Sequence, residues 1–201
     1  HPHIPFERYA DDIIVHCKNE RQAEWTKRVI EKRLLECKLE LHPDKTQIVY
    51  CKDDYRRGNY VNEKFDFLGY TFRPRGAKAR YKKSFFVGFN PALSNKAAKA
   101  MGDIIRSWEI HLMSDKSIED ISRIINPVVQ GWINYYSSYY RSAFYPIINQ
   151  LNNALRKWAM RKYKRLRGRK RKATLWLRKI ARRDRGLFAH WKFSAGSLAG
   201  R

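Results

Sequence analysis

The sequence predicts an α+β fold, in which strands and one helix come first and further helices follow. Two patterns lead to this fold class. Short β-prone runs alternate with turn residues near the N-terminus, whereas from about residue 74 onwards apolar residues recur at helical spacing. Of the 201 residues, 43% are hydrophobic and 14% are aromatic, which supplies a core and argues against intrinsic disorder. We expect three zones: residues 1–73, residues 74–167 and a basic C-terminal extension at residues 168–201.

The first zone opens with a predicted antiparallel β-hairpin. Phe6–Tyr9 and Ile13–Cys17 are β-prone and flank Ala10-Asp11-Asp12, and aspartate tolerates the backbone geometry of a tight turn. An amphipathic helix is expected next, beginning after an N-cap at Asn19 and ending near Lys38.

Further strands are expected between this helix and residue 73. The spans 39–41 and 48–50 flank the turn-forming segment His42-Pro43-Asp44-Lys45, and the span 65–72 is one more β-like run. The polar span 52–64 predicts a loop.

The second zone, at about 74–167, is predicted to be helical. Ser94 or Asn95 can cap its first helix, Ser117 opens a second, and Pro127 suits the first position of a third. A longer helix enters the basic segment and is expected to end at Gly168, and a basic helix lies in the third zone. The apolar faces predict helices over about 94–112, 117–125, 127–136, 147–168 and 175–180.

The charge of the chain indicates a polyanionic partner. There are 43 Lys and Arg residues against 19 Asp and Glu, which gives a net charge of +24 and a pI near 10.2. Between Arg156 and Arg185 lie 16 of these basic residues and a single acid. Such density predicts salt-sensitive contact with nucleic acid, ahead of an anionic membrane or a solubilising tail. The residues expected to make this contact are Arg161, Lys162, Lys164, Arg165, Arg167, Arg169, Lys170, Arg171 and Lys172.

Two other protein classes fit the sequence poorly. No apolar run approaches the ~20 residues that cross a bilayer, so no membrane-spanning segment is expected. The cysteines Cys17, Cys37 and Cys51 form no CxxC pair. Their spacing argues against a disulfide framework or a four-cysteine zinc site and favours a reducing compartment.

Asp11 and Asp12 are unusual in so basic a chain. Two adjacent carboxylates at a tight turn repel each other unless a cation is bound there. Carboxylate oxygens suit Mg²⁺, and two-metal phosphoryl transfer uses such ligands. A solvated Asp-Asp turn explains the same residues, and composition alone leaves both interpretations open.

Four short motifs occur in order along the chain. Tyr9-Ala10-Asp11-Asp12 lies between hydrophobic runs, Leu41-His42-Pro43-Asp44-Lys45-Thr46 follows, the span 65–72 has the sequence FDFLGYTF, and the span 125–136 has the sequence INPVVQGWINYY. Together they resemble the active-site, following palm, primer-grip and maturase (X, or thumb) motifs of group II intron-encoded reverse transcriptases. The resemblance covers nearly the whole chain.

This resemblance implies the C-terminal part of a polymerase palm over 1–73, an all-α thumb or maturase domain over 74–167, and a basic tail. It implies RNA-directed DNA polymerase and RNA maturase functions, with Mg²⁺ as cofactor and with intron RNA, an RNA template, a DNA primer and dNTPs as partners. Asp11 and Asp12 would bind the metal, and Lys45 would act near the triphosphate. The residues that would contact the primer or nucleotide are Tyr9, Ala10, Phe67, Leu68, Gly69 and Tyr70.

The segment after the maturase motif is rich in aromatic residues. Aromatic rings beside cations suit stacking on unpaired bases, and Arg141 is therefore expected to contact nucleic acid. Trp132 and Tyr136 are expected in the helical core instead, and Gly131 is expected to allow close helix packing. His190 is expected to be structural.

The resemblance also implies parts that this sequence lacks. The family's palm takes a third carboxylate from an earlier strand and uses its fingers to hold template and nucleotide, whereas only His1 to Arg8 precede Tyr9. We expect the C-terminal half of such a protein, without an endonuclease domain and inactive in polymerisation alone. The N-terminal half of the same protein is an expected partner, and a cytoplasmic bacterial ribonucleoprotein is the expected location.

Two alternatives belong to other classes. In a non-catalytic RNA-binding splicing factor, only the maturase and basic zones would act. A ribosome-associated basic protein would explain the charge but not the four ordered motifs.

Overall fold

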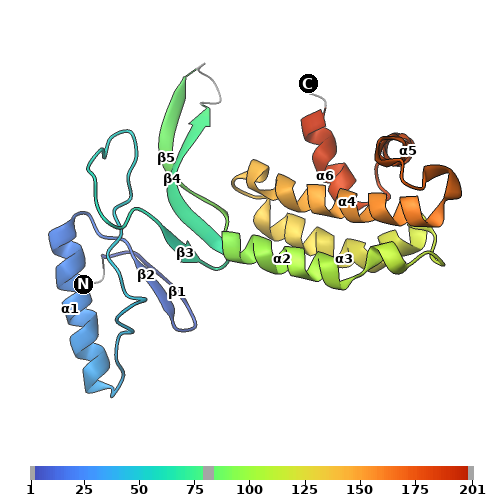
Figure 1. The fold of residues 1–201 in the computed structure, drawn as a ribbon. Coiled ribbons are helices and arrows are strands. Elements are labelled where there is room, and N and C mark those ends of the chain that lie inside the picture. The colour runs from blue at the N-terminus through green and yellow to red at the C-terminus, as the bar shows by residue number, and fades with distance from the viewer. Residues whose placement is uncertain (1–2, 79–83, 199–201) are drawn as a thin grey trace. The chain divides into compact units, whose positions relative to one another are not determined.

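The chain forms two compact units in the computed structural model, which describes residues 3–78 and 84–198 and the side chains among them up to residue 193 (Figure 1). The N-terminal unit comprises His1–Phe67 and Phe72–Phe89. The helical unit comprises Leu68–Thr71 and Asn90–Arg201.

The N-terminal unit begins with the predicted hairpin and helix. β1 (Phe6–Tyr9) pairs antiparallel with β2 (Asp12–Val15). α1 (Glu20–Glu36) follows and is capped as predicted, because Asn19 Oδ1 accepts a hydrogen bond from the backbone N–H of Gln22 at 2.9 Å. The side chain of Gln22 in turn accepts a hydrogen bond at 2.7 Å from the backbone N–H of Lys18, the residue just before the cap.

A second sheet contains β3 (Phe65–Phe67), β4 (Tyr70–Lys78) and β5 (Phe85–Leu93), in the order β3-β4-β5. Aromatic rings pack across it. The ring of Phe65 stacks on that of Phe72 with centroids 4.8 Å apart, and the Phe89 centroid lies 6.0 Å from that of Phe65.

Two predictions for this region are wrong. The span 65–72 is a hairpin and not a single strand, because Leu68 and Gly69 adopt left-handed backbone with φ of 49° and 78°. The described residues 74–78 and 85–93 lie in strands β4 and β5 and not in a helix. Proline is unusual inside a strand, so Pro74 hides the strand pattern in the sequence. In the fold, β3 has only three residues, and Pro74 lies in the part of β4 that extends past the end of β3.

The spans 39–41 and 48–50 form no strand either, contrary to the prediction. A strand needs a partner along its length. Here the segment is held at isolated points, where Tyr50 N donates to Asn62 O at 2.8 Å and Asn62 Nδ2 donates to Ile48 O at 3.4 Å. The predicted turn at residues 43–45 and the loop over 52–64 are both present.

The helical unit contains α2 (Asn95–Ser107) and α3 (Ile118–Tyr136), and both begin at predicted caps. Ser94 Oγ accepts from Ala97 N at 3.1 Å, and Ser117 and Asp120 form a reciprocal capping box. The other helices and 3₁₀ turns of this unit are η1 (Ile110–Leu112), η2 (Arg141–Phe144), α4 (Tyr145–Lys162), η3 (Lys164–Leu166), α5 (Lys170–Arg183) and α6 (Ala189–Leu198).

Helix α3 continues through Pro127, so the predicted break there is wrong. Proline removes one backbone hydrogen bond from a helix interior and clashes with the preceding turn. Ile125 and Val129 on either side of it are fully buried in the core. We infer that this packing outweighs the lost hydrogen bond.

Helix α4 ends at Lys162 and not at Gly168. Tyr163 has extended backbone, and its ring packs edge-on against Trp158 with centroids 5.9 Å apart. Gly168 keeps the left-handed conformation expected of a stop residue, with φ of 70°, but lies between η3 and α5.

The hydrophobic core of the helical unit includes the inner face of α4. Leu151, Leu155 and Trp158 are fully buried, together with Phe144 before the helix and Phe188 before α6. Among the described residues, none of the helices is apolar over a length that could cross a membrane.

Gly131 does not serve close packing, contrary to the prediction. A Cβ atom at this exposed position of α3 would meet no other atom within 4 Å. Because glycine lowers the stability of a helix interior by roughly 0.5–1 kcal/mol relative to alanine, Gly131→Ala should raise the free energy of unfolding by about that amount. Urea unfolding followed by circular dichroism measures it, and a loss of stability would contradict the described surroundings.

Helix α6 is attached to α3 and α4 through partly buried polar contacts. Asn126 Nδ2 donates to Leu187 O at 2.8 Å, and Asn126 Oδ1 accepts from Ala189 N at 3.0 Å. His190 Nε2 donates to Asn152 Oδ1 at 3.1 Å, whereas its Nδ1 has no hydrogen-bond partner among the described residues. His190 is 0% exposed, and this burial lowers its pKa to about 3.

We expect His190 to make the stability of the helical unit depend on pH. Below the ordinary histidine pKa of about 6.5, His190 binds a proton in the unfolded state but not in the folded state. The free energy of unfolding is therefore highest above pH 6.5 and falls as the pH is lowered. The loss should be about 1.4 kcal/mol per pH unit between pH 6.5 and 4.5. Tryptophan fluorescence during urea unfolding follows it, and His190→Gln should flatten the slope. An equal slope in both proteins would contradict the assignment.

Candidate functional site

The hairpin turn carries the two acidic residues singled out in the sequence. Tyr9 pairs with Asp12 across the strands, so the connection consists of Ala10 and Asp11 alone. Ala10 is left-handed with φ of 53°, and its carbonyl accepts from Arg8 Nε at 2.9 Å. Asp11 therefore lies at the tip and Asp12 at the start of β2, and both are exposed.

The two faces of this hairpin differ. Phe6, Ile13 and Val15 fall on one face and line an apolar pocket of about 210 Å³ together with residues of α1. Because side chains alternate along a strand, Tyr9 and Asp12 fall on the other face. Helix α1 thus covers one face of the hairpin. The other face carries Tyr9, which is 62% exposed, and the carboxylate of Asp12.

The chain contains a second adjacent pair of aspartates, which makes a useful contrast. Asp53 is bound by Arg56, whose hydrogen bonds lower the pKa of the Asp53 carboxyl, and Asp54 Oδ2 accepts from Val87 N at 3.0 Å. In the part of the chain that the structure describes, no hydrogen bond or ion pair engages the Asp11 or Asp12 carboxylate.

The donor chemistry of Asp11 and Asp12 fits a divalent cation, because free carboxylate oxygens are the ligands that Mg²⁺ prefers. Within residues 3–78 and 84–198, however, no three His, Cys, Asp or Glu side chains gather into a metal-binding group. The pair fits part of a metal site and needs further ligands.

Lys45 lies in the exposed turn at residues 43–45. None of the ion pairs found among the described residues joins it to Asp11 or Asp12. Its predicted role near a triphosphate stays a prediction.

The predicted primer-contacting residues surround the β3–β4 turn. Phe67 ends β3, Leu68 and Gly69 form the turn, and Tyr70 begins β4. The Leu68 side chain is 36% exposed, whereas Tyr70 is 8% exposed and its hydroxyl donates to Tyr135 O. Burial raises the pKa of Tyr70 to about 12. The turn therefore leaves Leu68 more accessible than Tyr70.

Most of the predicted basic residues form an exposed cationic surface that runs from the end of α4 through η3 into α5. No carboxylate among the described residues pairs with them. The exposed members are Arg161, Lys164, Arg165, Arg167, Arg169, Lys170, Arg171 and Lys172. They are free to meet phosphate groups.

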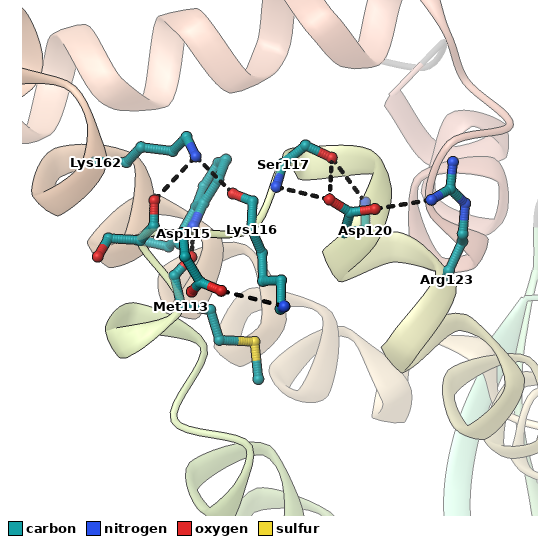
Figure 2. Close-up of polar contacts among 9 residues, drawn as sticks. Met113, Asp115, Lys116, Ser117, Asp120, Arg123 and Lys162 are labelled. Carbon is teal, nitrogen blue, oxygen red and sulfur yellow. Dashed lines mark hydrogen bonds and ion pairs between the residues drawn. The ribbon is translucent and has the colours of Figure 1, made fainter.

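Lys162 has a different environment (Figure 2). Its Nζ donates to Ser114 O at 3.0 Å and to Lys116 O at 2.7 Å, just before the Ser117 cap of α3. Trp158 Nε1 donates to Met113 O at 2.8 Å in the same loop. Lys162 is thus engaged in holding this loop, and its predicted contact with nucleic acid stays a prediction.

Arg141 is exposed, and its guanidinium lies 4.5 Å from the ring centroid of Phe193. Its predicted contact with nucleic acid also stays a prediction.

Sequence reasoning missed a groove on α5 with a volume of about 340 Å³. Cations border it and apolar side chains share its lining, which consists of Lys172, Leu175, Trp176, Arg178, Lys179 and Arg182. These residues recur every three or four positions, which places them on one face of a helix, and this spacing could have indicated the groove. These residues extend the cationic surface beyond Lys172.

Two protein-family models match parts of the chain. The family model for reverse transcriptase (RNA-dependent DNA polymerase) matches residues 2–72, and the model for the group II intron maturase-specific domain matches residues 98–176. No curated protein and no solved structure gives a significant match. The reverse transcriptase match includes the Asp11–Asp12 turn, and the maturase match includes α3, α4 and the start of α5.

Proposed function

Because the chain belongs to the group II intron reverse transcriptase and maturase family, we propose that its hairpin turn supplies metal-binding carboxylates for RNA-directed DNA synthesis and that its helical unit binds intron RNA. Reverse transcriptases of this kind use divalent metal ions, and the family's partners are nucleic acids. The observation that carries the first part is the exposed Asp11–Asp12 pair, whose carboxylates no described residue engages.

In this proposal Asp11 and Asp12 hold Mg²⁺, which when bound supplies charge stabilisation to the phosphate undergoing transfer. Tyr9 shares the open face of the hairpin with Asp12 and places its ring against the primer end or the incoming nucleotide. Lys45 contributes an ammonium charge near the triphosphate. Leu68 and Gly69 contact the primer strand. RNA template, DNA primer and dNTPs are the corresponding substrates.

The cationic surface supports the second part of the proposal. Its arginines and lysines can neutralise several phosphates of a folded RNA, and this attraction is largely independent of base sequence. Binding to one intron RNA in particular then depends on the shape of that RNA and on contacts elsewhere in the helical unit.

Templated primer extension tests the catalytic part. Because Asp11 and Asp12 lack a third ligand among the described residues, we expect no product from the chain alone with RNA template, primer, dNTPs and Mg²⁺. Product should form once a second polypeptide supplies the fingers and the earlier palm carboxylate of a group II intron reverse transcriptase.

The matched controls use the two aspartate pairs. Asp11→Ala should abolish product in the complemented reaction, whereas Asp53→Ala should leave it, because Asp53 serves its own loop. Equal product from both variants, or no product from the complemented wild-type chain, would contradict the proposal.

A further inference from the structure

The β3–β4 turn has a backbone conformation that needs external support. Leu68 and Gly69 are both left-handed, with φ of 49° and 78°. A leucine rarely adopts this conformation, since its Cβ approaches the following carbonyl oxygen, and the strain persists only where the surroundings hold it. The contacts of this turn therefore show what keeps it in place.

The turn is held by the helical unit. Tyr135 Oη, near the end of α3, donates to Leu68 O at 3.0 Å, and Ser94 N, at the cap of α2, donates to Gly69 O at 2.9 Å. Both carbonyls of the turn are thus engaged by helix ends. The chain divides accordingly, because Leu68–Thr71 belong to the helical unit although the residues on either side belong to the N-terminal unit.

Tyrosine rings close around the same point. The Tyr70 ring centroid lies 5.4 Å from that of Tyr135 and 5.3 Å from that of Tyr136. A Cβ atom added at Gly69 would lie only 2.5 Å from Tyr136 Oη. Two reasons therefore require glycine at position 69: its backbone has a positive φ, and Tyr136 occupies the space that a side chain would need.

We propose that Tyr135 and Tyr136 are positioning residues that hold the Leu68–Gly69 turn in the conformation that contacts the primer strand. The helical unit, and not the palm strands, then sets the position of this contact. The inference rests on the proposed function, because it takes from it that the turn meets the primer. The new element is that Tyr135 and Tyr136 set the position of the primer contact, although Tyr135 lies 67 positions after Leu68 in the chain.

Binding of an RNA–DNA hybrid tests this. Fluorescence anisotropy compares a hybrid with a recessed DNA 3′ end and a blunt hybrid of equal duplex length, on the full chain. The wild-type chain should prefer the recessed end. Tyr135→Phe leaves Leu68 O without its donor and should lower this preference about fivefold. The salt dependence of binding should not change, because no charge is removed.

A second pair of variants tests Tyr136. Gly69→Ala should also lower the preference, and adding Tyr136→Phe should restore part of it, because the clashing atom is the hydroxyl oxygen. Tyr139→Phe is the matched control: its ring lies edge-on to Tyr70 at 5.6 Å, and its hydroxyl has no hydrogen-bond partner among the described residues. It should behave as wild type.

The outcomes separate the two proposals. A wild-type preference that survives in Tyr135→Phe and in Gly69→Ala overturns the positioning role and leaves the proposed function standing. A wild-type chain that does not distinguish the two hybrids overturns the primer contact, and the positioning role with it.

Discussion

Replacing Arg165, Arg167, Arg169 and Lys172 together by glutamine should weaken binding to a stem–loop RNA roughly 10³-fold at 0.1 M salt. All four are exposed and without carboxylate partners among the described residues. Each phosphate contact releases counterions and adds about 0.7–0.9 to the slope of log K against log salt, so the slope should fall by about 3. Filter binding at several salt concentrations measures both quantities.

Helix α1 offers a control with the same change in net charge. Exposed basic residues on α1 are Arg21, Lys27, Arg28 and Lys32. Glutamates lie among them along the helix, so the local positive potential is weaker than at the cationic surface. Replacement of these four basic residues by glutamine should change affinity and slope far less. Equal losses from the two sets would mean that net charge alone, and not the cationic surface, governs RNA binding.

Replacing Trp158 by alanine should lower the free energy of unfolding of the helical unit by about 3–5 kcal/mol. Trp158 is 0% exposed, and its ring packs against Tyr163 and Trp176, which connects α4 to η3 and α5. Its removal leaves a large cavity, and Met113 O loses the donor Nε1. Urea unfolding measured by circular dichroism gives the value.

Two further substitutions separate the contributions at this position. Trp158→Phe keeps most of the packing and removes the hydrogen bond, so it should cost about 1–3 kcal/mol. Leu175→Ala removes a side chain that is 47% exposed and should cost under about 1 kcal/mol. If Trp158→Ala cost no more than Leu175→Ala, the described core would be wrong.

Local signals in the sequence predicted much of the fold. The hairpin, the caps at Asn19, Ser94 and Ser117, and the apolar faces of the helices depend on residues close together in the chain, and the structure contains all of them. The strands β4 and β5 were missed because each contains a proline, Pro74 in β4 and Pro91 in β5, and proline is unusual inside a strand.

Features that depend on distant residues could not be predicted. Nothing near Leu68 indicates that Tyr135 donates to its carbonyl, and nothing near Lys162 indicates that its ammonium holds the loop before α3. The acidic turn is the opposite case. Asp11 and Asp12 are adjacent in the chain, so a short motif located these candidate metal ligands.

The most direct test of the central claim is where a divalent metal binds. Mn²⁺, which favours the same oxygen ligands as Mg²⁺, broadens the NMR signals of nearby amides. At millimolar Mn²⁺ the amides of residues 9–13 should broaden first, and Asp11→Asn or Asp12→Asn should remove the effect. The engaged pair Asp53 and Asp54 serves as the internal control and should show little broadening. Equal broadening at both pairs, or broadening at the turn that survives both substitutions, would contradict the assignment of a metal site to the hairpin.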